Sequence, residues 1–269
     1  MSFELHIVDP AAGHAHTHTV ILLHGRDSKC QEFADELFES EASQPEGGPR
    51  TLRDLFPTVK WVFPGAAVIS SKRFGMPMSQ WFDVWSVENP DERPELQEQG
   101  LRDSTRFVLG ILERESAVVA RERIFLGGIS QGFAAALATF FAGGGSGVAG
   151  LIGLCSWSLP ELSRVAYEDA GEGDSPDARR RRLQSYFGAG LEGGLSEPRE
   201  AATPVFLGHA IDDDVVPVEN GRRLRLALEK VLGPVTWREY ESGGHWVNEP
   251  EGVDDIVEWL RLNMHRTRV

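Results

Sequence analysis

Short runs of apolar residues alternate along the chain with longer segments in which apolar residues recur every three or four positions. The short runs predict β-strands, and the longer periodic segments predict amphipathic helices. The predicted strands are Phe3–Val8, Thr19–Leu23, Thr58–Phe63, Arg123–Leu126, Val148–Leu154, Pro204–Gly208 and Val235–Tyr240. The predicted helices are Cys30–Glu39, Glu95–Val119, Gln131–Phe141, Val218–Leu232 and Val253–Met264. This alternation predicts an α/β fold with a mostly parallel central sheet and helices on both faces.

The first two predicted strands are joined by a polar segment without a helical pattern. We therefore expect them to form an antiparallel pair at one edge of the sheet. With 41% apolar residues, residues 1–269 are long enough to build one domain around a substantial core. Residues 64–89 form a long irregular segment, and such segments often carry function, so we interpret this one as the wall of a binding groove.

The sequence Gly128-Ile129-Ser130-Gln131-Gly132 reads G-x-S-x-G and lies between a predicted strand and a predicted helix. In this context a nucleophile elbow exposes a strained serine hydroxyl. The flanking glycines permit a sharp turn, and the backbone N–H of Gln131 becomes available to an oxyanion. Because the chain contains 29 glycines, the motif alone can arise by chance, and its context is what favours Ser130 as a nucleophile.

A serine nucleophile requires a histidine base and an orienting acid, which follow this kind of elbow in the order Ser, Asp or Glu, His. Of the eight histidines, His209, His245 and His265 come after Ser130. His209 precedes the best acid candidates, and His265 lies in a helical pattern. His245 lies in a glycine loop between a predicted strand and a predicted helix, so we predict it as the base.

Three adjacent carboxylates, Asp212, Asp213 and Asp214, follow the predicted strand Pro204–Gly208, where the acid is expected. Like charges so close together repel one another, so we expect two of the three to be solvated, with Asp212 available as a turn former. The pattern by itself leaves open which carboxylate orients the base.

Several motifs together resemble those of the acyl-protein thioesterase/lysophospholipase group, the phospholipase/carboxylesterase family of α/β-hydrolases. The matching segments are Leu22–Gly25, Trp81–Asp83, Leu126–Gly132, His209–Pro217 and Gly244–His245. They occur in the family's order and span most of the chain. The resemblance implies a single α/β-hydrolase domain, and several motifs in order are far more specific than any one of them.

The resemblance implies that Asp213 is the acid, because the family's loop reads His-Gly-x-x-Asp-x-x-Val-Pro and His209 and Pro217 fix its register. It also implies that the residue after His-Gly, here Arg26, donates its backbone N–H to the oxyanion together with Gln131. The chain departs from the family where Phe133 replaces a glycine and where Arg26 places a cation beside the oxyanion hole. Both departures keep the backbone donors but alter the surroundings of the substrate.

We predict substrate contacts from six apolar side chains near these motifs. They are Met76, Trp81, Phe82, Phe133, Trp157 and Trp246. Trp81 and Phe82 match family residues that form the floor of the site. For Trp81 and Trp157, ordinary packing in the core is an alternative interpretation.

These residue types predict a serine hydrolase that forms an acyl-enzyme and needs no metal or organic cofactor. The resemblance implies thioesterase or lysophospholipase activity on an acyl substrate: an S-acylated protein, a lysophospholipid or a small ester. Two alternatives remain open. One is a specialised-metabolism hydrolase of esters, lactones or thioesters, and the other is a catalytically silent scaffold, because a fold does not fix a function.

The formal net charge of −14 argues against nucleic-acid partners and against docking on anionic lipid. The sequence has no apolar run long enough for a transmembrane helix and no signal-peptide pattern at its start. The two cysteines, Cys30 and Cys155, are expected to be reduced, which favours a cytoplasmic location. His14, His16 and His18 alternate as metal ligands on a strand would, but an exposed edge is the simpler interpretation.

Overall fold

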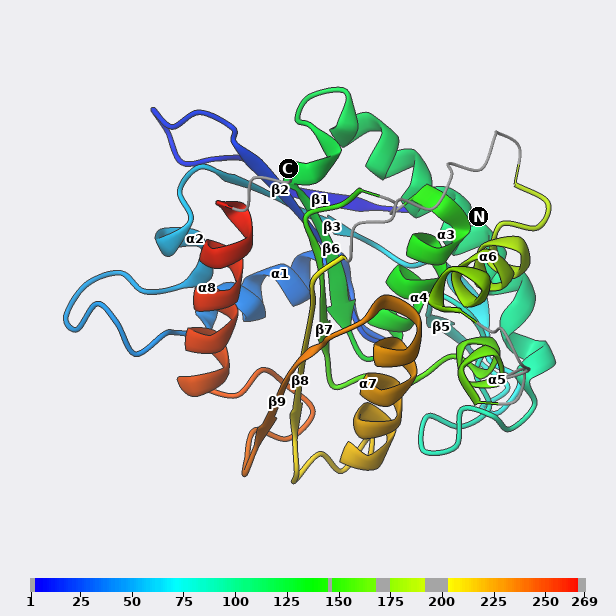
Figure 1. The fold of residues 1–269 in the computed structure, drawn as a ribbon. Coiled ribbons are helices and arrows are strands. Elements are labelled where there is room, and N and C mark those ends of the chain that lie inside the picture. Colours follow the sequence, from blue (N-terminus) through cyan, green and yellow to red (C-terminus); the bar gives the residue numbers. More distant parts are fainter. Residues whose placement is uncertain (1–2, 145–146, 168–174, 192–202, 266–269) are drawn as a thin grey trace.

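A central sheet with helices on both sides organises the molecule (Figure 1). The computed structural model describes residues 3–144, 147–167, 175–191 and 203–265. The sheet that they form has seven strands in the order β1-β3-β2-β6-β7-β8-β9, all parallel to their neighbours except β1. Its strands are β1 (Leu5–Val8), β2 (His18–Leu23), β3 (Val59–Pro64), β6 (Ile124–Ile129), β7 (Gly150–Leu154), β8 (Val205–Ala210) and β9 (Thr236–Tyr240). A separate hairpin pairs β4 (Val68–Ser70) with β5 (Pro77–Ser79).

The helices divide between the two faces of the sheet. One face is covered by α1 (Cys30–Glu39), α2 (Leu52–Leu55) and α8 (Glu251–Met264). The other is covered by α3 (Gln97–Ser116), α4 (Gln131–Thr139), α5 (Pro160–Tyr167), α6 (Pro176–Phe187) and α7 (Val218–Leu232). Short helical turns occupy Pro94–Leu96, Arg121–Arg123 and Phe140–Gly144. This three-layer arrangement confirms the predicted α/β fold with a mostly parallel sheet.

Strand β6, which leads to the elbow, lies in the middle of the sheet and is buried along its whole length. Ile124 and Leu126 pack into the core under α3 to α7, whereas Phe125 and Ile129 pack into the core under α1 and α8. Successive side chains of a strand point to opposite faces, so one short apolar run supplies both cores. The strand that leads to the elbow is therefore fixed by packing on both faces of the sheet.

The pairing predicted for the first two strands is wrong. Strand β1 is antiparallel and lies at the edge, as expected, but its partner is β3 rather than β2. Strand β2 is almost completely buried and pairs on both sides, with β3 and with β6. Only the outer edge of β3 remains for β1, whose Leu5 and Ile7 are exposed, as suits an edge strand.

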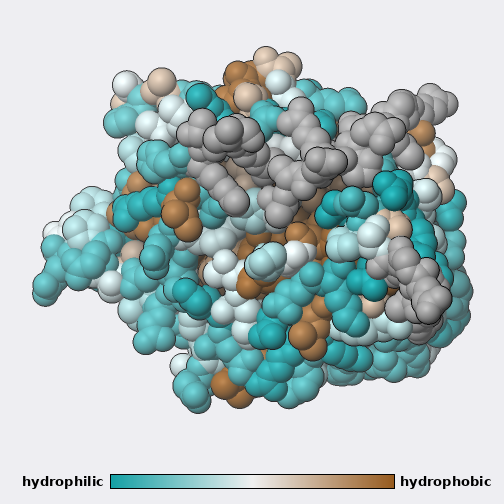
Figure 2. Space-filling model, in the orientation of Figure 1, coloured by the Kyte–Doolittle hydropathy of each residue, from teal (hydrophilic) through white to brown (hydrophobic). Residues whose placement is uncertain are grey.

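The face drawn in Figure 2 is mostly hydrophilic, with hydrophobic residues in separate patches, as expected for a chain of net charge −14. No helix in the described ranges is both long and apolar enough to cross a membrane.

Phe133, which departs from the family pattern, is fully buried in helix α4 rather than exposed at the elbow. Its ring lies against Gly153 of β7, where an added Cβ would be 2.4 Å from Phe133 Cε1 and 2.7 Å from Leu207 Cδ2. The large side chain on the helix thus fills the space that the glycine leaves on the strand. Helix α4 and the sheet fit together through this pair.

We expect Gly153→Ala to lower the free energy of unfolding by about 1–3 kcal/mol, because the Phe133 ring has no free space to enter. The matched control is Gly110→Ala in α3, where an added Cβ meets no atom within 4 Å. That substitution is expected to raise the free energy of unfolding by about 0.5–1 kcal/mol through helix propensity. Urea unfolding followed by circular dichroism measures both values, and similar changes in the two variants would contradict this packing argument.

Candidate active site

Ser130 occupies the tight turn between β6 and α4, with φ 55° and ψ −127°. A non-glycine residue in such a conformation costs roughly 1–3 kcal/mol and persists only where its surroundings impose it. Here Ser130 N donates to Leu154 O at 2.8 Å, and Ser156 Oγ donates to Ser130 O at 2.8 Å. The strain predicted for an elbow is therefore present and is held by the neighbouring strand end.

The two glycines of the motif are required by close approach of the turn to the end of β2. A Cβ on Gly128 would lie 2.4 Å from Leu23 O, and one on Gly132 would lie 2.2 Å from the same oxygen. Real Cβ atoms essentially never come so close to backbone atoms. The motif thus reflects packing of the elbow on β2 as well as backbone freedom at the turn.

The Asp213 carboxylate, on the loop after β8, accepts four hydrogen bonds. Its Oδ1 accepts from the N–H groups of Val215 at 2.9 Å and Val216 at 2.8 Å. Its Oδ2 is 2.8 Å from His245 Nδ1 and 3.1 Å from His209 Nε2. Burial by itself raises the pKa of Asp213, but the hydrogen bonds from His209, His245 and the Val216 N–H outweigh burial and hold the pKa well below its usual range.

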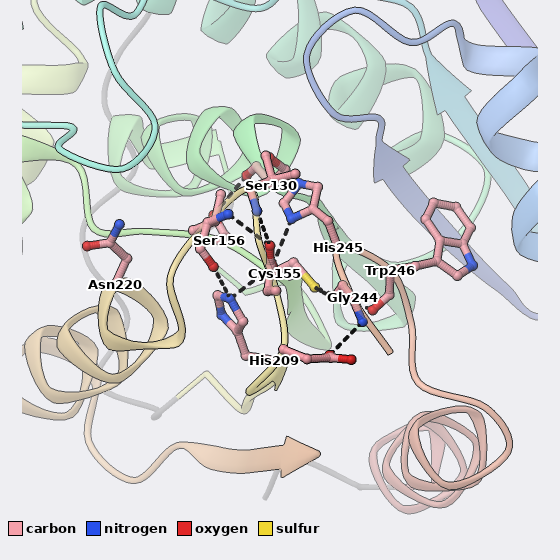
Figure 3. A network of polar contacts seen from close by, with 12 residues as sticks. Ser130, Cys155, Ser156, His209, Asn220, Gly244, His245 and Trp246 are labelled. Carbon is pink, nitrogen blue, oxygen red and sulfur yellow. Dashed lines mark hydrogen bonds and ion pairs between the residues drawn. The ribbon is translucent and has the colours of Figure 1, made fainter. Parts of the chain in front are cut away.

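His245 lies beside Ser130, and both residues line the same cavity (Figure 3). Because Nδ1 faces the Asp213 carboxylate, this nitrogen carries the proton and Nε2 is left as the acceptor. The loop that carries His245 is fixed by Asp212, whose Oδ1 accepts from Gly244 N at 2.8 Å. The three residues predicted as nucleophile, acid and base, Ser130, Asp213 and His245, are therefore brought together.

The three neighbouring carboxylates have different surroundings. Asp213 is 7% exposed, whereas Asp212 and Asp214 are exposed. The expectation of two solvated carboxylates agrees with this difference. Asp212 does more than form a turn, however, because it joins the loop after β8 to the loop of His245.

His209 supports the Asp213 carboxylate together with His245, because both rings approach the same oxygen, Oδ2. His209 is 1% exposed, and its Nε2 also lies 2.9 Å from Val216 O. Its ring packs on Gly221 of α7, where an added Cβ would be 2.4 Å from His209 Nδ1. In the sequence, His209 was set aside as the base and then fixed the register of the acid loop, without a predicted contact to Asp213. The four-residue separation of His209 and Asp213 in the sequence could have predicted this contact.

The backbone N–H groups of Arg26 and Gln131 have no hydrogen-bond acceptor within the described ranges. The Gln131 side chain anchors the other wall of the site, with Oε1 accepting from Trp81 N at 2.9 Å and Nε2 donating to Phe82 O at 2.8 Å. His24, expected to brace the loop that carries Arg26, has Nδ1 2.6 Å from Gly25 O and accepts from Ala66 N at 3.0 Å. Burial lowers the pKa of His24, which favours the neutral ring that these contacts require.

A cavity of about 410 Å³ opens over Ser130 and His245. Its wall is largely apolar, and the segment 64–89 contributes Phe74, Met78 and Val87 to it. The other apolar lining residues are Phe33, Ile129, Val215 and Trp246. Of these seven, only Trp246 was predicted as a substrate contact, although Phe74, Met78 and Val87 lie in the segment 64–89 that was predicted as a groove wall. The other lining residues could not be predicted from the sequence, because α1, the hairpin and the loop after β8 come together only in the fold.

Five of the six predicted substrate contacts do not line this cavity. Met76 is 54% exposed on the β4–β5 hairpin, whereas its neighbour Met78 faces the cavity. The remaining four, Trp81, Phe82, Phe133 and Trp157, are all less than 2% exposed and belong to the core under α3 to α7. They therefore support the site from behind, and the core alternative considered for Trp81 and Trp157 fits the structure.

Cys155, Asp213 and His245 place one potential metal-ligand atom each within 4.8 Å of one another. Asp213 and His245 are already bonded to each other, and burial raises the pKa of the Cys155 thiol, with the Asp213 charge adding to this effect. A thiol that keeps its proton is a poor ligand. We therefore assign these residues to the hydrogen-bonded group rather than to a metal centre.

Comparison with known proteins relates this geometry to one family. The family model described as Phospholipase/Carboxylesterase matches residues 5–166. An acyl-protein thioesterase 1 of Gibberella zeae is 31% identical over 96% of this chain and 95% of its own. Another acyl-protein thioesterase 1, of Cryptococcus neoformans, is 30% identical over 91% of this chain and 92% of its own.

Two solved structures share the fold along almost the whole chain. The crystal structure of Zea mays acyl-protein thioesterase 2 has a TM-score of 0.66 at 25% identity and covers 97% of this chain and 99% of its own. That of the Bacillus cereus carboxylesterase has a TM-score of 0.60 at 14% identity, with 97% and 94% coverage, and shows likeness of fold alone.

We expect Asp213→Asn to lower the free energy of unfolding near neutral pH by on the order of 2 kcal/mol, because it removes a buried, fully hydrogen-bonded carboxylate. A carboxyl group whose pKa is lower in the folded state contributes stability above its unfolded pKa of about 4. This contribution is lost as the pH falls toward the folded pKa. The difference between wild type and Asp213→Asn should therefore narrow below about pH 4.

Urea unfolding at several pH values between 7 and 3 measures this difference. The control is Asp214→Asn, which alters an exposed carboxylate in the same loop. A wild-type advantage over Asp213→Asn that stays constant down to pH 3 would contradict the assigned origin of the stability.

Proposed function

Because the chain belongs to the phospholipase/carboxylesterase family, we propose that it hydrolyses carboxylic esters or thioesters with Ser130 as nucleophile, His245 as base and Asp213 as the orienting acid. One observation carries this assignment. His245 Nδ1 lies 2.8 Å from a buried carboxylate, which leaves Nε2 as the acceptor in the cavity that Ser130 lines.

In the first half of the reaction, His245 Nε2 takes the Ser130 proton as Oγ attacks the acyl carbonyl carbon. The resulting imidazolium is stabilised by the Asp213 carboxylate, whose low pKa keeps it ionised. The leaving alcohol or thiol then takes the proton from His245, and Ser130 is left acylated. In the second half, water repeats the attack and releases the acid.

The backbone N–H groups of Arg26 and Gln131 are the proposed donors to the oxyanion that forms in each half. Each such donor is worth about 3 kcal/mol of barrier by precedent. Gln131 N–H lies at the first turn of α4, where the free N–H groups of the helix also favour negative charge. The bonds of the Gln131 side chain to Trp81 and Phe82 hold this turn against the wall of the site.

The substrate is an acyl compound, and the relatives named acyl-protein thioesterase favour a thioester on an S-acylated protein. A lysophospholipid, whose phosphate suits the Arg26 cation beside the cavity, or a small ester is the second candidate. A cytoplasmic location belongs to the proposal as well. A silent scaffold of this fold usually lacks one of the three catalytic residue types, whereas this chain retains Ser130, Asp213 and His245, which disfavours that alternative.

We expect wild type to hydrolyse p-nitrophenyl esters between acetate and palmitate, and Ser130→Ala to lose this activity by about 10³-fold or more. The acyl-chain length that gives the highest turnover measures the length of the acyl-binding groove. Labelling by a fluorophosphonate probe should likewise disappear in Ser130→Ala. Equal turnover in both proteins would refute Ser130 as nucleophile, and a wild type that neither turns over nor reacts with the probe would revive the scaffold alternative.

Substitutions in the acid loop distinguish the roles of the three neighbouring carboxylates in catalysis. Asp213→Asn should reduce kcat by about 10⁴-fold, because the asparagine amide favours the wrong tautomer of His245. Asp212→Asn should cost far less, since it weakens only the bond to the Gly244 N–H. Asp214→Asn should leave kcat unchanged. Steady-state kinetics on one ester measures all three, and an inactive Asp214→Asn would show that the acid is misassigned.

A further inference from the structure

Arg26 is one of the residues that line the cavity of Ser130 and His245. Its Cζ lies 5.4 Å from the centroid of the Phe74 ring, a distance at which a cation is attracted to an aromatic face. Phe74 itself comes from the β4–β5 hairpin and lines the same cavity. The side chain is thus held between the oxyanion loop and the hairpin.

The guanidinium has no acceptor within the part of the chain that the structure describes. Its Nη1 is buried without a hydrogen-bond partner, and no ion pair with Arg26 occurs among those residues. Burial lowers the pKa of Arg26, with the nearby charge of Arg73 adding to this effect. Arg26 is half-buried, and a guanidinium with a buried, unpartnered donor is suited to an anionic partner that the described part of the chain does not supply.

The acidic residues around Arg26 do not supply this anion. Asp27 and Glu36 also line the cavity, but both are exposed and neither lies within 4.0 Å of the guanidinium as an ion pair. Asp83 is buried, its Oδ2 accepts from Lys72 N at 3.0 Å and its Oδ1 has no partner, but it forms no ion pair with Arg26. Glu88 also acts on Arg26 through its charge, and its Oε2 accepts from Ser86 Oγ at 3.2 Å. These carboxylates moderate the positive potential of the cavity without occupying the donors of Arg26.

We propose that Arg26 binds an anionic group of the substrate, a carboxylate or a phosphate, close to the scissile acyl bond. The inference rests on the proposed function and specifies its substrate class: acidic esters or thioesters. The planar guanidinium fork suits both anions, because it can donate two parallel hydrogen bonds to either. The backbone N–H of the same residue is a proposed oxyanion donor, so the anion lies within one arginine side chain of the reacting carbonyl.

The anion can belong to the acyl group or to the leaving group, and two pairs of substrates distinguish these sources. The acyl arm compares the p-nitrophenyl half-ester of glutaric acid with the same compound capped as a methyl ester. The leaving-group arm compares S-pentanoyl 3-mercaptopropionate with S-pentanoyl 3-mercaptopropanamide. Within each pair, only the charge of the distal group changes.

The variant is Arg26→Met, which keeps the backbone N–H and the apolar stem. We expect the ratio of kcat/KM for the anionic and neutral substrates to fall by about tenfold or more in at least one arm. Any effect of the substitution on the oxyanion hole acts on both members of a pair and cancels in this ratio.

The matched control is Arg73→Met, which removes an exposed arginine that stacks on the same Phe74 ring, with Cζ 5.6 Å from its centroid. Arg73 does not line the cavity, so Arg73→Met should change the ratio of kcat/KM for the anionic and neutral substrates by less than about twofold. A ratio that Arg26→Met leaves unchanged in both arms, or that Arg73→Met lowers equally, would overturn the proposal.

Binding to Ser130→Ala separates this inference from the proposed reaction. Calorimetry should show that adding Arg26→Met weakens binding of the anionic substrate about tenfold. The double variant should then bind the anionic substrate no more tightly than the neutral one. Equal binding with and without Arg26 would refute anion recognition even if hydrolysis occurs. Arg26-dependent binding without any turnover by wild type would support anion recognition and refute the hydrolase proposal.

Discussion

The buried Asp213 carboxylate is the interaction on which the arrangement of the site depends. A charge so buried is tolerated only when its oxygens are hydrogen-bonded, and here four donors approach them. Two donors come from the loop that carries Asp213, one from the end of β8 and one from the loop after β9. The carboxylate therefore fixes the position of His245 and, through the bond of Asp212 to Gly244, the course of that loop.

The Asp213 carboxylate also depends on packing between the sheet and the helices that cover it. His209 can approach Asp213 only because Gly221 leaves space for its ring on α7. In the same way, the elbow can approach β2 only because Gly128 and Gly132 have no side chains. Glycines at the points of closest contact thus allow the helices to approach the sheet, and this approach brings Ser130 and His209 to their positions in the site.

The wall of the site is tied to the elbow by polar contacts from the core side. Gln131 bonds to the backbone of Trp81 and Phe82, and the Trp81 indole donates to His24 O at 2.8 Å. These bonds explain why Trp81 and Phe82 matter to the site without facing the substrate. They link the loop that carries Arg26, the elbow helix and the segment that follows the hairpin.

Elements with strong local patterns were predicted well from the sequence. The bounds of α1 and α7 agree with the predicted Cys30–Glu39 and Val218–Leu232, because both helices have a clear apolar face. The sequence pattern gave no bounds for the helices α2, α5 and α6 or for the short strands β4 and β5. Helix α6 contains the basic run Arg179–Arg182, which obscures its apolar face, and strands of three residues carry too little pattern.

The sequence by itself determined the fold class, the elbow at Ser130 and the order of the proposed nucleophile, acid and base, because each depends on local pattern and chain order. Tertiary structure alone decided which strand pairs with β1, that His209 shares the Asp213 carboxylate, and which side chains line the cavity. Trp81 and Phe133 look like substrate contacts from their position in the chain, yet they lie in the core. Whether a side chain faces a cavity or the core depends on how distant layers pack, and no local pattern encodes that.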